Sequence, residues 1–187
     1  MSPALGFILA WTAWALSWGA AAAWSSHTAK RSAIASALAY RLTITAGAVL
    51  LFHRTSERLK APMLWHVGLI GAWLLVAVAV LGFLFTWWAR LHLGKLWSGS
   101  VTLKEDHRII DSGPYGLVRH PIYTGILVAI FATAAAEATL PAMTGAALMS
   151  LGIWMKARVE EKFLRQELGA AAYDSYAARV PMLLPFL

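Results

Sequence analysis

The chain has 187 residues, of which 59% are hydrophobic and only 13% are charged. A soluble domain of this length needs a more polar surface, so the composition indicates an integral membrane protein. The net charge of +7 would suit nucleic-acid binding in a soluble protein, but beside long apolar runs it fits basic residues that face anionic lipid. The chain contains no cysteine, which excludes disulfides, thiolate nucleophiles and cysteine-based metal sites.

An uncharged stretch at the start of the chain predicts the first membrane helix, at residues 4–24. Its 21 residues are enough to cross a hydrocarbon core of about 30 Å at about 1.5 Å per residue. A cleaved signal peptide is the alternative, but the stretch lacks a basic n-region and is longer than a typical apolar h-region. We therefore expect a membrane span that the protein retains.

Two further apolar runs predict the second and third membrane helices, at residues 34–52 and 64–88. The second run is interrupted by one charge, Arg41, and a charge inside the bilayer is costly and functional by default. Arg41 lies only seven residues from Ile34, however, so we favour a side chain that snorkels to the nearer membrane surface. A polar connection of 33 residues, 89–121, follows the third run.

A run of 34 residues with a single charge, Glu137, predicts a hairpin of two membrane helices. The run is too long for one comfortable span, and Pro141 lies within it. We expect helices at residues 122–138 and 141–156, joined by an outer turn near Glu137, to which we give no role. The tail that follows is charged and mostly helical. Since neither a repeat nor a linker is visible, residues 1–187 form one expected domain.

The distribution of Lys and Arg predicts the orientation of the five spans. Twelve of these residues fall on one side, in segments 30–31, 90–119 and 156–179, and three fall on the other, between residues 54 and 60. The positive-inside rule places the richer side, with the long connection and the C-terminal tail, in the cytoplasm and the N-terminus outside. A site formed by these segments could receive a water-soluble reagent from the cytosol and an apolar one from the bilayer.

The sequence GPYGLVRHPIYTG, residues 113–125, gathers polar chemistry where the chain re-enters the membrane. Pro121 suits the first turn of a helix, because its missing N–H would be unpaired there anyway. The backbone N–H groups of residues 122–124 would then be free at a positive helix end, which favours a carboxylate or phosphate. Such a site would be flanked by Tyr115, Arg119, His120 and Tyr123. The alternative is an interfacial belt around a simple re-entry turn, and the residues alone leave both readings open.

This stretch is one of several motifs that occur in a fixed order. It is preceded by His107-Arg108-Ile109-Ile110 and followed by Glu160-Glu161, Gly169, Tyr173, Val180-Pro181 and Pro185. Over roughly residues 97–186 the set resembles the isoprenylcysteine carboxyl methyltransferase family, and the related phospholipid N-methyltransferases share much of it. The resemblance implies a membrane methyltransferase that uses S-adenosylmethionine without a Rossmann fold. In such enzymes a cytosolic pocket encloses the cofactor, and a lipophilic acceptor enters laterally between helices.

The same resemblance implies roles for single residues. The implied cofactor-binding set is His107, Arg108, Ile109, Ile110, Tyr115, His120, Pro121, Ile122, Tyr123 and Glu160. Its members up to Tyr115 would line the adenosine part, and those from His120 to Tyr123 would hold the amino-acid end. The implied catalytic set is Arg119, Lys156 and Glu160. The family places an Arg one helical turn before this Glu, whereas this chain has Lys156 there and Arg158 two residues before Glu160.

We therefore expect an all-α integral membrane protein of about five transmembrane helices, with a cytoplasmic cofactor pocket formed by the 89–121 connection and the C-terminal tail. Its expected partners are the bilayer and a lipophilic acceptor, and we expect no nucleic acid. The histidines are too scattered along the sequence to indicate a metal site. The leading function is methyl transfer to an isoprenylcysteine-type carboxylate. The runner-up is phosphatidylethanolamine-type N-methylation, in which His120 or Glu160 would take the amine proton. A non-enzymatic membrane scaffold is the competing class.

Overall fold

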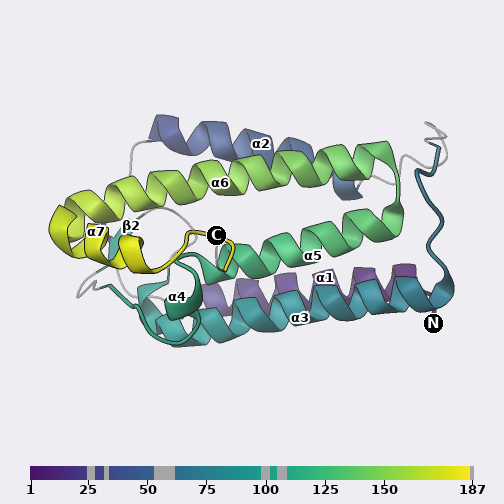
Figure 1. Cartoon of the computed structure of the whole chain (residues 1–187), viewed down its shortest axis with the longest axis horizontal. Coiled ribbons are helices and arrows are strands. Elements are labelled where there is room, and N and C mark those ends of the chain that lie inside the picture. The colour runs from purple at the N-terminus through teal and green to yellow at the C-terminus, as the bar shows by residue number, and fades with distance from the viewer. Residues whose placement is uncertain (25–27, 32–33, 53–61, 98–101, 105–108, 186–187) are drawn as a thin grey trace.

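The computed structural model describes residues 1–24, 28–31, 34–52, 62–97, 102–104 and 109–185. In this part of the chain five long helices lie side by side, and successive ones run in opposite directions (Figure 1). Their bounds are α1 Pro3–Ala22, α2 Ile34–Phe52, α3 Leu69–Leu93, α5 Pro121–Glu137 and α6 Leu140–Leu168. Each predicted span overlaps one of these helices, but α6 continues to Leu168, well beyond the end predicted at residue 156.

The shorter elements gather at one end of the bundle, which we call the α7 end (Figure 1). They are the 3-10 turn η2 Gly94–Leu96, α4 Pro114–Leu117, α7 Ala170–Arg179, and the strands β1 Thr28–Arg31 and β2 Thr102–Lys104. The two strands pair antiparallel and tie the connection after α1 to the connection after α3. The architecture is otherwise helical, as expected, and strands of three and four residues are too short to show an alternating apolar pattern in the sequence.

The third helix lies five residues later than the span predicted at residues 64–88. Leu64 donates its backbone N–H, and Trp65 its indole N–H, to carbonyls at the end of α5, so this apolar segment is extended and does not begin the helix. At its other end α3 continues to Gly94, which has φ +59° and ends the helix in a conformation that favours glycine. The polar connection after α3 is therefore shorter than expected.

The predicted helical hairpin is confirmed. The α5 helix ends at Glu137, Ala138 takes the left-handed conformation with φ 52°, and Thr139 caps α6 by accepting a hydrogen bond from the Ala142 N–H. Pro141 lies in the first turn of α6, where its missing N–H costs nothing. The two helices consequently run antiparallel, and α6 returns the chain to the α7 end.

Two helix pairs pack closely through glycine. A Cβ on Gly82 of α3 would lie 2.6 Å from the Gly125 carbonyl of α5, and a Cβ on Gly145 of α6 would lie 2.6 Å from the Gly47 carbonyl of α2. Larger side chains at these positions would push the backbones apart. Small residues at crossing points are the usual way in which membrane helices approach each other.

Two tryptophans of α1 donate hydrogen bonds across the bundle. The indole N–H of Trp11 donates to the Thr133 hydroxyl at 3.0 Å, and that of Trp14 donates to the Thr86 hydroxyl at 2.9 Å. Both threonines are buried. These two rings therefore fix α1 against α5 and α3.

The outer surface of the bundle is apolar. Its most exposed large side chains include Ile70, Leu81 and Leu42, which are 78%, 63% and 62% exposed. By length and composition, two helices, Pro3–Ala22 and Leu69–Leu96, can cross a membrane. So many large apolar side chains exposed along the helices would be unfavourable in water, so they indicate contact with lipid.

A buried arginine joins two helices at the α7 end. Arg90 is fully buried near the end of α3 and donates hydrogen bonds to the carbonyls of Ala21 and Trp24, where α1 ends. Its guanidinium also lies 4.9 Å from the ring centroid of Trp24 and 4.7 Å from that of Trp97. A cation is favourable at the negative end of a helix, so Arg90 stabilises the end of α1.

Candidate functional site

The C-terminal tail runs along the start of α5. The backbone N–H of Arg119 donates to the Pro181 carbonyl at 2.8 Å, and that of His120 donates to the Met182 carbonyl at 3.1 Å. The Thr124 hydroxyl donates to the Leu183 carbonyl at 2.7 Å. Met182 and Leu183 therefore contact the motif segment, whose backbone groups need hydrogen-bond partners.

The start of α5 has the form that the sequence predicts, with one difference. Pro121 occupies the first turn, and His120, the residue before it, makes no side-chain cap hydrogen bond. The N–H of Thr124 donates to the His120 carbonyl at 3.0 Å and is therefore not free. The N–H groups of Ile122 and Tyr123 precede this first helical bond, so their positions give them no partner within the helix.

The last turns of α6 bring charged side chains to the start of α5. At about 1.5 Å per residue the helix is about 43 Å long, so it extends beyond a hydrocarbon core of about 30 Å. On this extension Glu160 accepts a hydrogen bond from the Tyr123 hydroxyl at 2.7 Å, and its other oxygen lies 3.6 Å from His120 Nδ1. Lys156 Nζ lies 5.1 Å from the centroid of the Tyr123 ring. His120, Tyr123 and Glu160 of the implied cofactor-binding set therefore contact one another, and Lys156 lies over the Tyr123 ring.

The aromatic rings of His120 and Tyr123 stack within this group. Their centroids are 5.3 Å apart and their planes differ by 7°. The stacked pair is bounded by Glu160 on one edge and by Lys156 over the Tyr123 face. The result is a small, partly buried surface with one carboxylate and one ammonium group at the end of an apolar bundle.

The neighbouring carboxylate, Glu161, is buried and was missed as a site residue. Its Oε1 lies 2.6 Å from Arg119 Nε and 3.3 Å from His120 Nε2. Burial by itself raises the pKa of Glu161, but the hydrogen bonds from His120 and Arg119 and their charges outweigh burial and hold the pKa at about 2. The carboxylate is therefore ionised at neutral pH.

The ordinary alternative for Glu160 and Glu161 is a solvated helix face that pairs with Lys156 and Arg165 at four-residue spacing. Arg165 instead forms an exposed pair with Asp174, with N–O distances of 2.7 and 2.8 Å. Adjacent residues on a helix point about 100° apart, so the two carboxylates face different neighbours. The only hint in the sequence that Glu161 belongs to the site was its place beside Glu160 in the family motif.

Arg119 makes further contacts with the tail. Its Nη1 donates to the Ala177 carbonyl at 3.0 Å and to the Val180 carbonyl at 2.5 Å. Together with Glu161, these contacts direct the guanidinium toward the end of α7. A catalytic role for Arg119 stays a prediction, and its described contacts are to the protein.

The residues expected to line an adenosine pocket lie beside this group. Tyr115 is buried in α4, and burial raises the pKa of its phenol far above the usual range. Its carbonyl accepts a hydrogen bond from the Tyr176 hydroxyl at 2.8 Å, and its ring stacks on His92 with centroids 6.4 Å apart. Sequence reasoning gave His92 no role.

Ile109 and Ile110 pack on opposite parts of this region. Ile110 contacts the apolar cluster that contains Tyr115 and Ile122, whereas Ile109 contacts the cluster around Tyr173. His107 and Arg108, the other two members of the implied set, lie outside the described residues.

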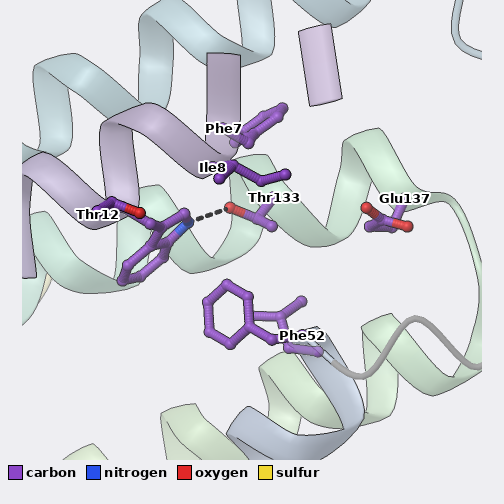
Figure 2. Close-up of a pocket in the computed structure, with 8 residues that line it drawn as sticks. Phe7, Ile8, Thr12, Phe52, Thr133 and Glu137 are labelled. Atoms are coloured by element: carbon purple, nitrogen blue, oxygen red, sulfur yellow. Dashed lines mark hydrogen bonds between the residues drawn. The ribbon is translucent and has the colours of Figure 1, made fainter. Parts of the chain in front are cut away.

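A pocket of about 170 Å³ lies at the opposite end of the bundle and is partly open (Figure 2). Its lining residues are Phe7, Ile8, Trp11, Thr12, Leu51, Phe52, Thr133 and Glu137. Figure 2 shows the hydrogen bond from Trp11 to Thr133 on one wall of the pocket. None of the implied site residues lines this pocket, so it is separate from the group at the α7 end.

The fold and the group at the α7 end define a helical protein with a lipid-facing surface and a charged, partly buried site where α5 begins. A sequence model of the isoprenylcysteine carboxyl methyltransferase family matches residues 74–166. The chain is also 30% identical over 150 residues to a probable protein-S-isoprenylcysteine O-methyltransferase of Oryza sativa subsp. indica, and the match covers 73% of this chain and 72% of that protein. The chain belongs to this family.

Two bacterial relatives have different names. Methanethiol S-methyltransferase 2 of Bradyrhizobium diazoefficiens is 36% identical over 138 residues, which are 66% of this chain and 50% of that protein. The cobalt-zinc-cadmium resistance protein CzcN of Cupriavidus metallidurans is 30% identical over 129 residues, 68% of this chain and 51% of that protein. The family and the apolar helices together support a membrane-bound methyltransferase.

Proposed function

We propose that this protein transfers a methyl group from S-adenosylmethionine to a lipophilic acceptor that reaches the site from the bilayer. The observation that carries the proposal is the meeting of Glu160, His120, Tyr123 and Lys156 at the start of α5. This group combines polar contacts for a charged cofactor with a position at the end of an apolar helix bundle. Family membership supports the same reaction.

The described residues fit the cofactor. S-adenosylmethionine has a sulfonium, an ammonium, a carboxylate and an adenosine. The Glu160 carboxylate suits a cationic group, and the N–H groups of Ile122 and Tyr123 suit the carboxylate. The buried ring of Tyr115, with Ile110 against its cluster, suits the flat adenine. When bound, the cofactor would supply an activated methyl group.

The chain's own part in the reaction is binding, alignment and exclusion of water. An in-line displacement on an activated methyl donor needs no covalent enzyme intermediate, and good orientation alone supplies roughly 7–11 kcal/mol. The Tyr123 hydroxyl holds Glu160, and the His120 ring stacks on Tyr123 beside it. The tail carbonyls of residues 180–183 accept hydrogen bonds from Arg119, His120 and Thr124 at the start of α5, on the side that we propose to be cytosolic.

The leading acceptor is an isoprenylcysteine-type carboxylate. Such an acceptor is ionised at neutral pH and needs no general base, only a cation to hold it. Lys156 is the cation beside Tyr123, although an ammonium lacks the planar fork with which Arg binds both carboxylate oxygens. The relatives named as isoprenylcysteine methyltransferases support this assignment.

A thiol is the second candidate acceptor, favoured by the relatives named methanethiol S-methyltransferase. A thiol must lose its proton, for which His120 is the nearest candidate base in the group. Phosphatidylethanolamine-type N-methylation, the alternative from the sequence, also needs such a base. These acceptors place different demands on Lys156 and His120, so variants can separate them.

The orientation follows from the same proposal. Five spans would place the α7 end, where most Lys and Arg lie, in the cytoplasm and the N-terminus on the other side. The cofactor is water-soluble and the acceptor is not, so a site at a cytoplasmic membrane surface suits both. A protease or labelling reagent applied to sealed vesicles would test this orientation directly.

The decisive experiment offers methyl-labelled S-adenosylmethionine to the purified protein with four acceptors in parallel: a farnesylcysteine analogue, an alkyl thiol, phosphatidylethanolamine and a crude lipid extract. Base-labile label on the farnesylcysteine supports the carboxylate acceptor, a labelled thioether supports the thiol, and base-stable label in a phospholipid headgroup supports N-methylation. A Glu137→Gln variant at the opposite end of the bundle is the control and should retain activity. No transfer and no cofactor binding would leave the scaffold as the better explanation.

A further inference from the structure

One carboxylate at the site is buried and paired with two side chains of the motif segment. Glu161 is 8% exposed, and its Oε1 receives both the Arg119 Nε at 2.6 Å and the His120 Nε2 at 3.3 Å. The proposed reaction assigns it no contact with the cofactor or the acceptor. A buried ion pair is costly to form, so its presence beside a functional group calls for an explanation.

The contacts of Arg119 supply that explanation. Beyond Glu161, the guanidinium donates to the carbonyls of Ala177 and Val180, where α7 ends and the tail begins. The backbone N–H groups of Arg119 and His120 donate to the next two tail carbonyls. One side chain of α6 thus fixes the arginine that holds the tail.

The same carboxylate also orients the imidazole. His120 lies with Nε2 toward Glu161 and Nδ1 toward Glu160 at 3.6 Å. A hydrogen bond to one ring nitrogen fixes the orientation of a histidine and therefore what the other nitrogen faces. The position of the tail and the orientation of His120 consequently depend on one group.

We propose that Glu161 is a positioning residue, which holds the tail at residues 177–183 closed over the cofactor pocket through Arg119 and fixes the ring of His120 against Glu160. The inference rests on the proposed function for its cofactor. The tail contact itself is a property of the protein alone. Removing the charge of Glu161 therefore opens the tail first and weakens cofactor binding as a consequence.

Trypsin provides a readout of the tail that needs no cofactor. The bond after Arg179 is followed by the buried Val180, so the closed tail protects it. With Glu161→Gln, release of the peptide 180–187, measured by mass spectrometry in detergent, should be about tenfold faster, which corresponds to the loss of one charged hydrogen bond. Glu161→Asp, which keeps the charge, should restore part of the protection.

Calorimetry with S-adenosylmethionine provides the second readout. Glu161→Gln should bind about tenfold more weakly, whereas Glu160→Gln should weaken binding without faster release of the peptide. Asp174→Asn is the matched control, because it breaks the exposed pair of Arg165 and Asp174 and should change neither measurement. If Glu161→Gln does not fold, Arg119→Lys is the second variant. It keeps the positive charge but lacks the planar guanidinium that donates to Glu161 and to the tail, so it should also open the tail.

The outcomes separate the two proposals. Equal peptide release from Glu161→Gln and the wild-type protein overturns the positioning role, whatever the cofactor does. Faster release with unchanged cofactor binding overturns the link between the tail and the pocket. If the wild-type protein binds no S-adenosylmethionine, the proposed function fails, and peptide release still decides whether Glu161 holds the tail.

Discussion

The Tyr123 hydroxyl donates a hydrogen bond to Glu160 Oε1 at 2.7 Å and thereby joins the first turn of α5 to the extension of α6. Its partner carboxylate is only partly buried and retains a second oxygen, which lies 3.6 Å from His120 Nδ1. A carboxylate held in this way faces a ligand in one orientation and does not sample several. Pre-organisation of this kind lowers the entropy lost on binding.

Tyr123→Phe should weaken S-adenosylmethionine binding several-fold while the protein stays folded. The variant keeps the ring that lies under Lys156 and stacks on His120, so only the hydrogen bond to Glu160 is lost, a change of about 1–1.5 kcal/mol. Isothermal titration calorimetry measures the effect. Trp65→Phe, which removes an indole hydrogen bond at the opposite end of the bundle, is the control. Equal affinity for Tyr123→Phe and the wild-type protein would remove Tyr123 from the site.

Lys156 is predicted to set the preference for a carboxylate acceptor. Lys156→Met keeps the length of the side chain but removes its charge, so KM for a farnesylcysteine analogue should rise about tenfold with a smaller change in kcat. Lys156→Arg offers the planar fork and should lower KM. Steady-state kinetics on both variants make the comparison. A thiol acceptor should respond much less, and a KM that is the same in all three proteins would contradict the role of Lys156.

The low pKa of Glu161 predicts a particular dependence of stability on pH. Its pKa is about 2 in the folded protein and 4.5 for an ordinary glutamate, so the folded state binds fewer protons between these values. The stabilisation is complete above about pH 4.5 and is lost as the pH falls through about 2. Thermal unfolding in detergent should therefore show that the wild-type protein has a higher Tm than Glu161→Gln. This difference in Tm should be constant from pH 5 to 7 and should decrease toward pH 3. A difference in Tm that increases in acid would show that the carboxylate is not held ionised.

The length and apolar content of the long runs were enough to predict α1, α2 and α5 to within a few residues at both ends. They also predicted the start of α6, but not its continuation to Leu168. The hairpin at Glu137 was also predictable, because Pro141 and the length of the run both indicate it. The start of α3 was not, since residues 64–68 contain no Lys, Arg, Asp or Glu and so continue the uncharged run without a visible break. Their extended path depends on hydrogen bonds to the end of α5, which no local pattern encodes.

The candidate site was predictable only in part for the same reason. His120, Tyr123 and Glu160 come from ordered motifs, and the structure brings them together. Glu161 could not be told from a solvated neighbour, because its burial depends on Arg119 from a distant segment. The contact of Met182 with His120 likewise joins residues far apart in the chain.

Gly82 allows α3 and α5 to approach closely, and this contact holds the first turns of α5 in position against α3. A Cβ there would lie 2.6 Å from the Gly125 carbonyl, which belongs to backbone and cannot rotate away. Gly82→Ala should therefore lower the free energy of unfolding by about 1–3 kcal/mol and weaken cofactor binding through a displaced α5. Gly19→Ala is the matched control, because a Cβ at Gly19 has no neighbour within 4 Å among the described residues and alanine favours the helix. Thermal unfolding in detergent compares the two variants; a Gly82→Ala protein as stable as Gly19→Ala would show that the helices are not in close contact.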